Sequence, residues 1–312
     1  MSRRALVTGA NGFVGRRLCR HLRESGWDVR EAIHGAMEDP RLQRQLNLGQ
    51  AEDITSLLEW TGPLSHVFHL AAVTSVPEAV DSPVNVMEVN LLGTMRLVAA
   101  VERSYKNARF IFVSSSAVYG APRQLPVTEQ HPLEPGNPYA ISKAAADEFC
   151  RYAHKASGMD IVRLRPFNHS GAGQDDRFVL SSFARQVAQI ERGKRAPVLQ
   201  VGNLEARRDF SHVDDVILAY ELAALHAQPG EAYNICSGKA WSMQEALDRL
   251  MALAECQITV EIDESRLRPV DVLDITGSHD KFVSACGWRP AKGFDEILKD
   301  LLTHWREVEK AN

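Results

Sequence analysis

The stretch Leu6-Val7-Thr8-Gly9-Ala10-Asn11-Gly12-Phe13-Val14-Gly15 decides the fold, because it joins an apolar run to three glycines spaced G-x-x-G-x-x-G. The apolar residues before Gly9 predict a buried strand, and the residues after Gly12 have the apolar spacing of a helix. In such a turn Gly9 permits the tight bend, Gly12 lets the backbone approach a pyrophosphate, and Gly15 lets the helix pack closely on the sheet. The helix N-terminus presents free N–H groups to phosphate. The stretch therefore predicts a dinucleotide-binding turn, with a glycine-rich turn that binds no ligand as the alternative.

Short apolar runs alternate with helical patterns through the first half of the chain. Strands are expected at 5–8, 29–33, 66–71, 110–114 and 161–164, and helices at 12–25, 86–103 and 139–157. This alternation predicts an α/β fold, a Rossmann-like doubly wound parallel sheet covered on both faces, with a smaller α/β C-terminal lobe. We expect residues 1–166 plus about 211–235 to form the dinucleotide-binding domain, and about 167–210 and 236–312 to form the smaller lobe.

Composition narrows the class of protein. The chain has 312 residues and a net charge of −4, and its basic residues form no long stripe, so no nucleic-acid partner is expected. Five scattered cysteines share no metal-ligand spacing, which predicts reduced thiols in a cytoplasmic protein and no metal site. The first residues lack the apolar stretch of a signal peptide, and no apolar run approaches the ~18 residues of a membrane span.

Two further motifs carry hydroxyl and amine groups. Phe112-Val113-Ser114-Ser115-Ser116-Ala117-Val118-Tyr119-Gly120 places serines at the carboxyl end of a predicted parallel strand, where such sheets bind ligands. Pro138-Tyr139-Ala140-Ile141-Ser142-Lys143 opens a predicted helix, and Tyr139 and Lys143, four residues apart, share one face. An isolated pair of this kind is usually structural, so the order of all three motifs carries the prediction of a catalytic site.

The predicted chemistry is proton transfer coupled to hydride transfer. A free phenol has a pKa of about 10, which is too weak an acid-base group for neutral pH. Lowering that pKa by ~3 units takes roughly 4 kcal/mol, which we expect the Lys143 ammonium and an oxidised nicotinamide to supply. Tyr139 then exchanges a proton with a sugar hydroxyl or ketone, and a serine hydroxyl near 115 supports the same oxygen.

Together these motifs resemble the extended short-chain dehydrogenase/reductase family, also called the NAD-dependent epimerase/dehydratase family. The resemblance runs along nearly the whole chain and includes Phe68-His69-Leu70-Ala71-Ala72 and Val89-Asn90-Leu91-Leu92-Gly93-Thr94. It implies Ser115, Tyr139 and Lys143 as catalytic residues. The residues implied for the nicotinamide cofactor are Gly9, Asn11, Gly12, Phe13, Val14, Gly15, Arg16, His34, Asn47, Leu48, Leu70, Ala71, Ala72, Asn90, Tyr139, Lys143 and Pro166.

The second half of the chain narrows the resemblance. Segments 165–174 and 201–210, together with 233–238 and 267–269, resemble the family's enzymes of GDP-6-deoxyhexose synthesis, above all GDP-4-keto-6-deoxy-D-mannose reductases. The implied function is NAD(P)H-dependent reduction of the C4 ketone of GDP-4-keto-6-deoxy-D-mannose to GDP-D-rhamnose, with the smaller lobe binding the nucleotide sugar. The expected substrate residues are Thr74, Ser75, Val76, Ser115, Ser116, Asn168, Val201, Asn203, Glu205, Arg208 and Arg268. Arginines suit a diphosphate, because the guanidinium is permanently charged and donates in pairs.

One position departs from this pattern. Reductases and 4,6-dehydratases of the group carry an acid two residues before the Tyr-Gly pair, where this chain has Ala117. Dehydration is therefore set aside, because Ser116 and Ala117 supply no carboxyl group for it. The serine run 114–116 resembles UDP-galactose 4-epimerases, which leaves an NAD-dependent nucleotide-sugar 4-epimerase as the alternative function. A non-catalytic nucleotide-binding protein on the same fold is a third hypothesis.

Cofactor choice and association are also addressed by the sequence. The second strand ends without an acid at its tip, so Arg16 and His34 are expected to face a 2′-phosphate, which favours NADP(H) over NAD(H). Glu31 is the competing ribose ligand. The predicted helices near 90–104 and 139–157 carry small residues that permit close packing, and the resemblance implies that they form a homodimer interface. These small residues are Ala99, Ala100, Ala144, Ala145 and Ala146.

Overall fold

The structure is a computed structural model that describes residues 3–267 and 272–311. The strands are β1 (Arg4–Thr8), β2 (Asp28–Ile33), β3 (Gln43–Gln45), β4 (His66–His69), β5 (Arg109–Val113), β6 (Ile161–Pro166), β7 (Asn168–Ser170), β8 (Val198–Val201), β9 (Arg207–His212), β10 (Ala232–Ile235), β11 (Ala240–Ser242), β12 (Thr259–Ile262) and β13 (Asp274–Ile275). The α-helices are α1 (Phe13–Glu24), α2 (Ala51–Thr61), α3 (Val76–Asp81), α4 (Pro83–Met87), α5 (Gly93–Ser104), α6 (Pro138–Ser157), α7 (Val179–Glu191), α8 (Val213–His226), α9 (Met243–Met251), α10 (Asp280–Cys286) and α11 (Phe294–Ala311). Three short helical segments complete the description, the π-helix η1 (Glu88–Leu92) and the 3₁₀ turns η2 (Ser116–Tyr119) and η3 (Glu264–Arg266).

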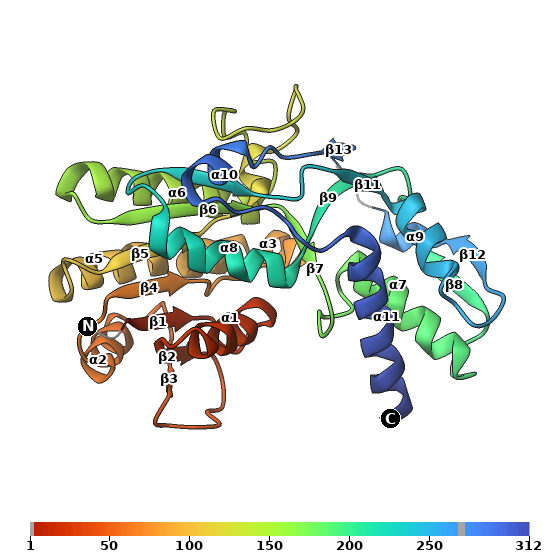
Figure 1. Ribbon diagram of the computed structural model, residues 1–312, viewed down its shortest axis with the longest axis horizontal. Coiled ribbons are helices and arrows are strands. Elements are labelled where there is room, and N and C mark those ends of the chain that lie inside the picture. Colours follow the sequence, from red (N-terminus) through yellow and green to blue (C-terminus); the bar gives the residue numbers. More distant parts are fainter. Residues whose placement is uncertain (1–2, 268–271, 312) are drawn as a thin grey trace.

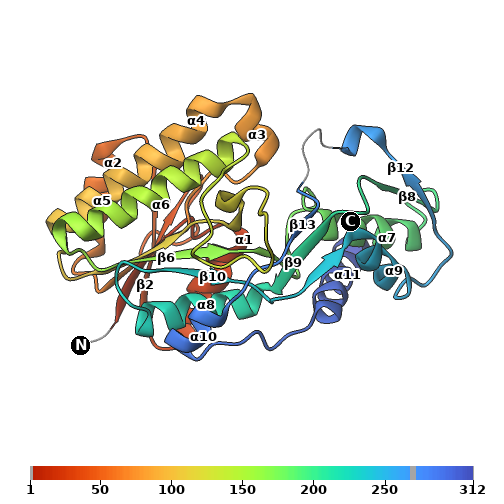
Figure 2. The same cartoon turned by 90° about the horizontal axis from the view of Figure 1, so that it is seen from above.

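A parallel sheet with the strand order β10-β6-β5-β4-β1-β2-β3 lies at the centre of the larger part of the described chain. β1 is central and pairs in parallel with β2 on one side and β4 on the other. The helices cover both faces, with α5 and α6 on one side and α8 and α10 on the other (Figure 2). The predicted α/β class with a doubly wound parallel sheet is confirmed. All carboxyl ends of these parallel strands lie at one edge, so the glycine turn and the serine run reach the same place.

Two apolar layers hold the helices to this sheet. Leu18 and Leu22 of α1 and Val216 of α8 pack with Val7 on one face. On the other face, Leu97 and Val101 of α5 and Cys150 of α6 pack with Phe110 and Phe112 of β5. The strands are buried on both faces, which explains why their sequences are continuous apolar runs rather than alternating ones.

The smaller part is built from short strands and the helices α7, α9 and α11 (Figure 1). β11, β9, β13 and β7 form one sheet, and β8 pairs with β12. α7, α9 and α11 surround a separate apolar core that includes Leu180, Leu247 and Leu301. The chain then returns to the large sheet, because Phe282 of α10 and Trp288 pack in the core around α1 and α8. The predicted division placed residues 280–288 in the smaller lobe. The division of the chain into two domains stays a prediction.

Two sequence expectations concern membranes and thiols. The continuous helix Pro83–Ser104 is long and apolar enough to suit a membrane span by length and composition, although no apolar run of that length was expected from the sequence. That is weak evidence, since 44% of its most apolar window is buried inside the protein and α5 packs on α2 and α6. All five cysteines are described and carry free thiols.

Candidate active site

The glycine turn over β1 fits a dinucleotide diphosphate. Gly9 has φ +69°, and a Cβ there would lie 2.9 Å from the backbone nitrogen of Ala71. A Cβ on Gly15 would collide with the carbonyl oxygen of Gly9, so only glycine lets α1 approach β1 this closely. Gly12 is exposed and begins α1 without a side-chain cap on the helix N–H groups. A diphosphate satisfies such N–H groups and complements the positive end of the helix.

The structure around the end of β2 distinguishes between the residues predicted to bind the adenine ribose or its 2′-phosphate, which are Glu31 on one hand and His34 and Arg16 on the other. Glu31 is only 8% exposed and accepts hydrogen bonds from Arg23 (2.6 Å) and Gln43 (2.8 Å). It is therefore engaged beneath the strand and is not available at the crevice. His34 is exposed at the tip, where its backbone carbonyl accepts a hydrogen bond from Asn11 Nδ2 (2.7 Å). Arg16 is exposed on the first turn of α1.

The catalytic candidates come from β5 and α6. Asn137 caps α6 by accepting from the N–H of Ala140 (2.9 Å), and Pro138 occupies the first helical turn, so the sequence starts the helix just before Tyr139. The Ser115 hydroxyl accepts from the N–H of Ala117 (3.2 Å) and lies close enough to the Tyr139 side chain to lower its pKa. The structure thus brings together two groups that are 24 residues apart in sequence.

Lys143 lies on the same helix but turns toward β5. Its Nζ donates to the carbonyl oxygen of Val113 (2.5 Å) and lies 4.7 Å from the centroid of the Phe112 ring. Burial lowers the pKa of this ammonium to about 8, because little water reaches the charged form. The amine is anchored to the last residue of β5, two residues before Ser115.

The pKa of Tyr139 differs from the sequence prediction. Burial raises the pKa of Tyr139, and the hydrogen bond from Ser115 offsets that rise only in part. Lys143 does not lower the pKa of Tyr139 in this structure, since its ammonium donates to the carbonyl oxygen of Val113. The predicted depression also requires an oxidised nicotinamide and stays a prediction. Tyr139 therefore holds its proton at neutral pH, which is the form that can donate to a ketone oxygen.

Asn90 binds protein groups on either side of the crevice. Its side chain accepts from the N–H of Val73 (2.8 Å) and donates to the carbonyl oxygen of Val73 (3.0 Å) and to Ser142 Oγ (2.9 Å). Ser142 Oγ in turn donates to the carbonyl oxygen of Tyr139 (2.7 Å). Asn90 thus ties the loop after β4 to the first turn of α6, a role the sequence did not reveal.

The other predicted cofactor residues fall into three groups. Val14 and Leu70 are half-buried and pack on the core beneath the glycine turn, and Ala71 donates its N–H to Thr8 Oγ1 (3.2 Å). Phe13 begins α1, Ala72 lies in the loop after β4, and Pro166 ends β6. Asn47 and Leu48 lie farther out on the other face, where Leu48 packs closely against Gly93 and Asn47 accepts from the N–H of Gly49 (2.9 Å).

The predicted substrate residues lie on several loops. Thr74 is exposed, Ser75 caps α3 by accepting from the N–H of Glu78 (3.3 Å), and Val76 begins that helix. Ser116 is buried in η2, and Asn168 is exposed on β7 just beyond the end of β6.

The predicted substrate residues on β8, on β9 and between them differ in their surroundings. Val201 is fully buried in the core of the smaller part, so its side chain does not face a ligand. Asn203 accepts from the N–H of Glu205 (2.9 Å), and Arg208 donates to the carbonyl oxygen of Arg207 (2.8 Å). Arg268 lies outside the described residues.

His169 lies next to the predicted substrate residue Asn168, and no role was assigned to it from the sequence. Its Nδ1 lies 3.0 Å from the carbonyl oxygen of Phe167, which fixes Nδ1 as the donor and leaves Nε2 as an acceptor. Burial lowers the pKa of His169, so the imidazole is neutral beside Asn168. Only its place in the quoted 165–174 segment hinted at a role, because one histidine has no spacing pattern.

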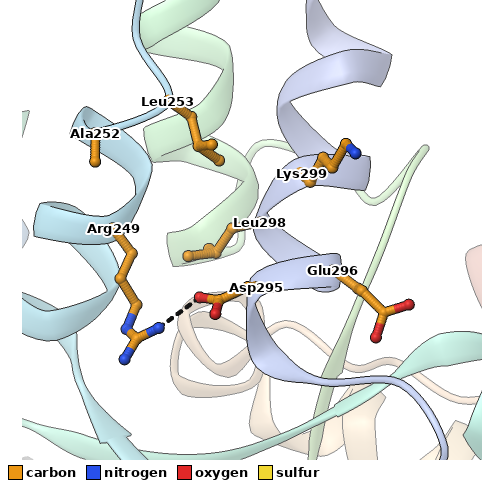
Figure 3. Close-up of a pocket in the computed structure, with 7 residues that line it drawn as sticks. All are labelled: Arg249, Ala252, Leu253, Asp295, Glu296, Leu298 and Lys299. Atoms are coloured by element: carbon orange, nitrogen blue, oxygen red, sulfur yellow. Dashed lines mark hydrogen bonds and ion pairs between the residues drawn. The ribbon is translucent and has the colours of Figure 1, made fainter.

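A cavity of about 360 Å³ lies between α9 and α11, away from these residues (Figure 3). Arg249 and Asp295 form a 2.6 Å ion pair on its rim, and Leu253 and Leu298 line it. It contains none of the hydroxyl, amine or helix N-terminal groups described above. The chemistry is therefore assigned to the edge of the large sheet.

Comparison with known proteins identifies the family. A family described as GDP-mannose 4,6 dehydratase matches residues 6–301. The chain belongs to this family. This match confirms the family resemblance that the three sequence motifs indicated. Ala117 nevertheless provides no carboxyl group beside Ser115.

Family members with different activities are similar to this chain. GDP-6-deoxy-D-mannose reductase of Pseudomonas aeruginosa is 34% identical over 98% of both chains. The solved structure of RMD from Pseudomonas aeruginosa complexed with NADPH has a TM-score of 0.89 and 33% identity, covering 98% of this chain and 100% of that chain. UDP-glucose 4-epimerase of Thermus thermophilus in complex with NAD has a TM-score of 0.86 and 30% identity, covering 97% of this chain and 99% of that chain.

Proposed function

We propose that this protein reduces the C4 ketone of GDP-4-keto-6-deoxy-D-mannose to GDP-D-rhamnose with NADPH. The observation that carries the proposal is that Ser115, Tyr139 and Lys143 come together at the carboxyl end of β5, at the same sheet edge as the glycine turn. It is supported by the 34% identity with the Pseudomonas aeruginosa reductase over nearly the whole length of both chains.

The residues of this chain suit the reductive direction. When bound, NADPH supplies the hydride that the ketone carbon accepts. Tyr139 donates its proton to the ketone oxygen, and its raised pKa keeps that proton on the phenol until the oxygen becomes basic. Ser115 donates to the same oxygen and supports its developing negative charge. Asn168 and Arg208, together with the unplaced Arg268, are the groups proposed to bind the substrate diphosphate.

The test is direct. Purified protein mixed with GDP-4-keto-6-deoxy-D-mannose and NADPH is expected to oxidise the NADPH, which lowers the absorbance of the reduced nicotinamide, and to form GDP-D-rhamnose. Absence of turnover with this and related 4-keto sugars would overturn the proposal.

The proposed preference for NADPH rests on the tip of β2. Glu31 is engaged by Arg23 and Gln43 and so does not oppose a 2′-phosphate, and the side chains of Arg16 and His34 are both exposed. Arg16→Gln is expected to raise the KM for NADPH by up to about fivefold, as an exposed ion pair is worth about 1 kcal/mol or less, and to leave the KM for NADH unchanged. Equal effects on both cofactors would contradict this assignment.

A 4-epimerase is the second candidate, favoured by the serine run 114–116 and by the similarity to the Thermus thermophilus epimerase. An epimerase oxidises and then reduces the same carbon, so it retains NAD through each cycle. Protein purified with stoichiometric bound NAD that interconverts UDP-sugars would replace the reductase proposal. Protein purified without bound cofactor would count against the epimerase.

We also propose a homodimer through the outer face of α5 and α6. Leu92 directly before α5 and Ile141 and Tyr152 of α6 are exposed. Ala99 of α5 and Ala145 of α6 are half-buried. Ala100, Ala144 and Ala146 pack inside the subunit instead and are not available to a partner. Light scattering after gel filtration is expected to give twice the mass of the 34.7 kDa chain.

A further inference from the structure

Arg17 joins the glycine turn to the loop that follows Asn168. It lies on the first turns of α1, next to Arg16, and its guanidinium carbon lies 4.7 Å from the centroid of the Phe13 ring. Arg17 Nη1 donates to the carbonyl oxygen of Phe13 (3.4 Å). One side of the guanidinium is therefore held by the residue that directly follows Gly12.

The other side of the guanidinium reaches the smaller part of the protein. Arg17 Nη2 donates to the carbonyl oxygen of Ala172, 155 residues away in sequence. Ala172 belongs to the turn between β7 and α7, which lies beside α1 (Figure 1). This hydrogen bond thus connects the cofactor helix with the segment that carries Asn168 and His169.

The turn that Arg17 grips is itself tied to β7. Gln174 donates from Nε2 to the carbonyl oxygen of His169 (3.0 Å) and accepts from Ser170 Oγ (2.5 Å). Its own carbonyl oxygen accepts from Ser181 Oγ at the start of α7 (2.6 Å). Because these hydrogen bonds link β7 to the turn, a displacement of Ala172 would also displace the backbone next to Asn168.

The charge of Arg17 is retained although its side chain is only 21% exposed. Burial lowers the pKa of Arg17, and the carboxylates of Asp214 on α8 and Asp300 on α11 oppose that change. Arg17 Nε lies 3.9 Å from Asp214 Oδ1, and Asp214 also accepts from Lys292 Nζ (2.7 Å). Three helices from both parts of the fold therefore converge on one guanidinium.

We infer that Arg17 is a positioning residue that couples cofactor binding to nucleotide-sugar binding, an inference that rests on the proposed function. A diphosphate bound at the N-terminus of α1 would restrict the motion of Gly12 and Phe13, and with them the guanidinium that stacks on Phe13. The guanidinium would then hold Ala172, and hence β7, in one position. The nucleotide sugar would bind more tightly, because less conformational entropy is lost when it binds to a segment that is already ordered. Shared ordering of this kind makes two ligands bind cooperatively, and the coupling is reciprocal.

The test measures the dissociation constant of GDP by calorimetry with and without saturating NADP⁺. In wild-type protein NADP⁺ is expected to tighten GDP binding by about fivefold or more, the lower end of usual coupling factors. In Arg17→Gln the ratio is expected to fall close to one, while NADP⁺ alone binds nearly as in wild type. The same variant is expected to raise the KM for the keto sugar with little change in kcat.

Arg20→Gln is the matched control, because Arg20 is an exposed arginine on the same helix and its loss changes the net charge equally. It is expected to retain the wild-type coupling ratio. Arg17→Lys is the second variant in case the glutamine variant does not fold. A lysine keeps the charge but has no planar fork to span Phe13 and Ala172, so a reduced ratio is expected.

The outcomes separate the inference from the reductase proposal. A folded Arg17→Gln protein with the wild-type ratio, or a wild-type ratio of one, would overturn the coupling role even if the enzyme reduces the keto sugar. Coupling that depends on Arg17 in a protein without reductase activity would sustain the inference and overturn the reductase. Wild-type protein that binds neither NADP⁺ nor GDP would overturn both.

Discussion

The cofactor side and the substrate side of the crevice are specified in different ways. On the cofactor side, ten consecutive residues from Leu6 to Gly15 contain the strand, the turn and the helix start. On the substrate side, Asn168 and Arg208 come from β7 and β9, and no short stretch contains both. The first side is a local backbone feature, whereas the second depends on how separate strands pair. Substitutions on the two sides should therefore fail differently.

The largest effect is expected where both sides meet. Tyr139→Phe removes the proton donor and should lower kcat by about 10²–10⁴, with NADP⁺ and GDP affinities unchanged. Steady-state kinetics and calorimetry measure the two quantities. Tyr152→Phe is the control, since Tyr152 is 64% exposed on the same helix and should retain wild-type kcat. Wild-type kcat in Tyr139→Phe would remove Tyr139 from the mechanism.

A substrate-side change should affect substrate affinity alone. Hydrogen bonds to charged groups are worth about 1.5–3 kcal/mol, so Arg208→Gln should raise the KM for the keto sugar roughly tenfold to a hundredfold and leave the KM for NADPH unchanged. Arg207→Gln is the neighbour control, because Arg207 is paired with Glu245 and Asp274. If both variants raise the KM alike, general loss of positive charge explains the effect instead.

A cofactor-side change should reduce stability as well as binding. A Cβ at Gly15 would lie 2.8 Å from Ala10 Cα and would collide with the carbonyl oxygen of Gly9, so Gly15→Ala forces α1 away from β1. Overpacking of this kind costs about 1–3 kcal/mol in unfolding free energy, measured by urea denaturation. Gly136→Ala, where a Cβ meets nothing within 4 Å, should leave the unfolding free energy nearly unchanged. A fully stable Gly15→Ala protein with normal NADP⁺ affinity would contradict the close packing.

The effect that is smallest at neutral pH is a dependence on pH. Lys143 has a pKa of about 8 in the folded protein, so its ammonium is lost as pH rises through 8, and kcat/KM should fall by about tenfold per pH unit above that value. The stability effect has the opposite sign. The unfolded chain, with an ordinary pKa near 10.5, binds more protons between pH 8 and 10.5, so this group makes the folded state relatively more stable as pH rises through that window. A flat kcat/KM profile from pH 7 to 10 would show that the charge of Lys143 is not needed.

The same contrast explains which predictions from sequence were correct. The glycine turn, the strand before it and the helix at Tyr139 were predictable because each depends on neighbours in the chain, such as the collision that only Gly15 avoids. The family resemblance was confirmed because it rests on the order of such local motifs along residues 6–301. Val201, by contrast, was assigned to the substrate but is buried in an apolar core, since the pattern could not show which face of β8 turns inward.

The sequence alone determined the parallel α/β sheet, the glycine turn and the candidates Tyr139 and Lys143, because strand and helix periodicity and glycine geometry are local properties, and the family resemblance added Ser115. Only the tertiary structure decided that Glu31 is engaged below β2, that Lys143 donates to Val113, that burial raises the pKa of Tyr139, and that Arg17 meets Ala172. Each of these depends on groups brought together from distant parts of the chain, where packing sets both the partner and the amount of water that remains.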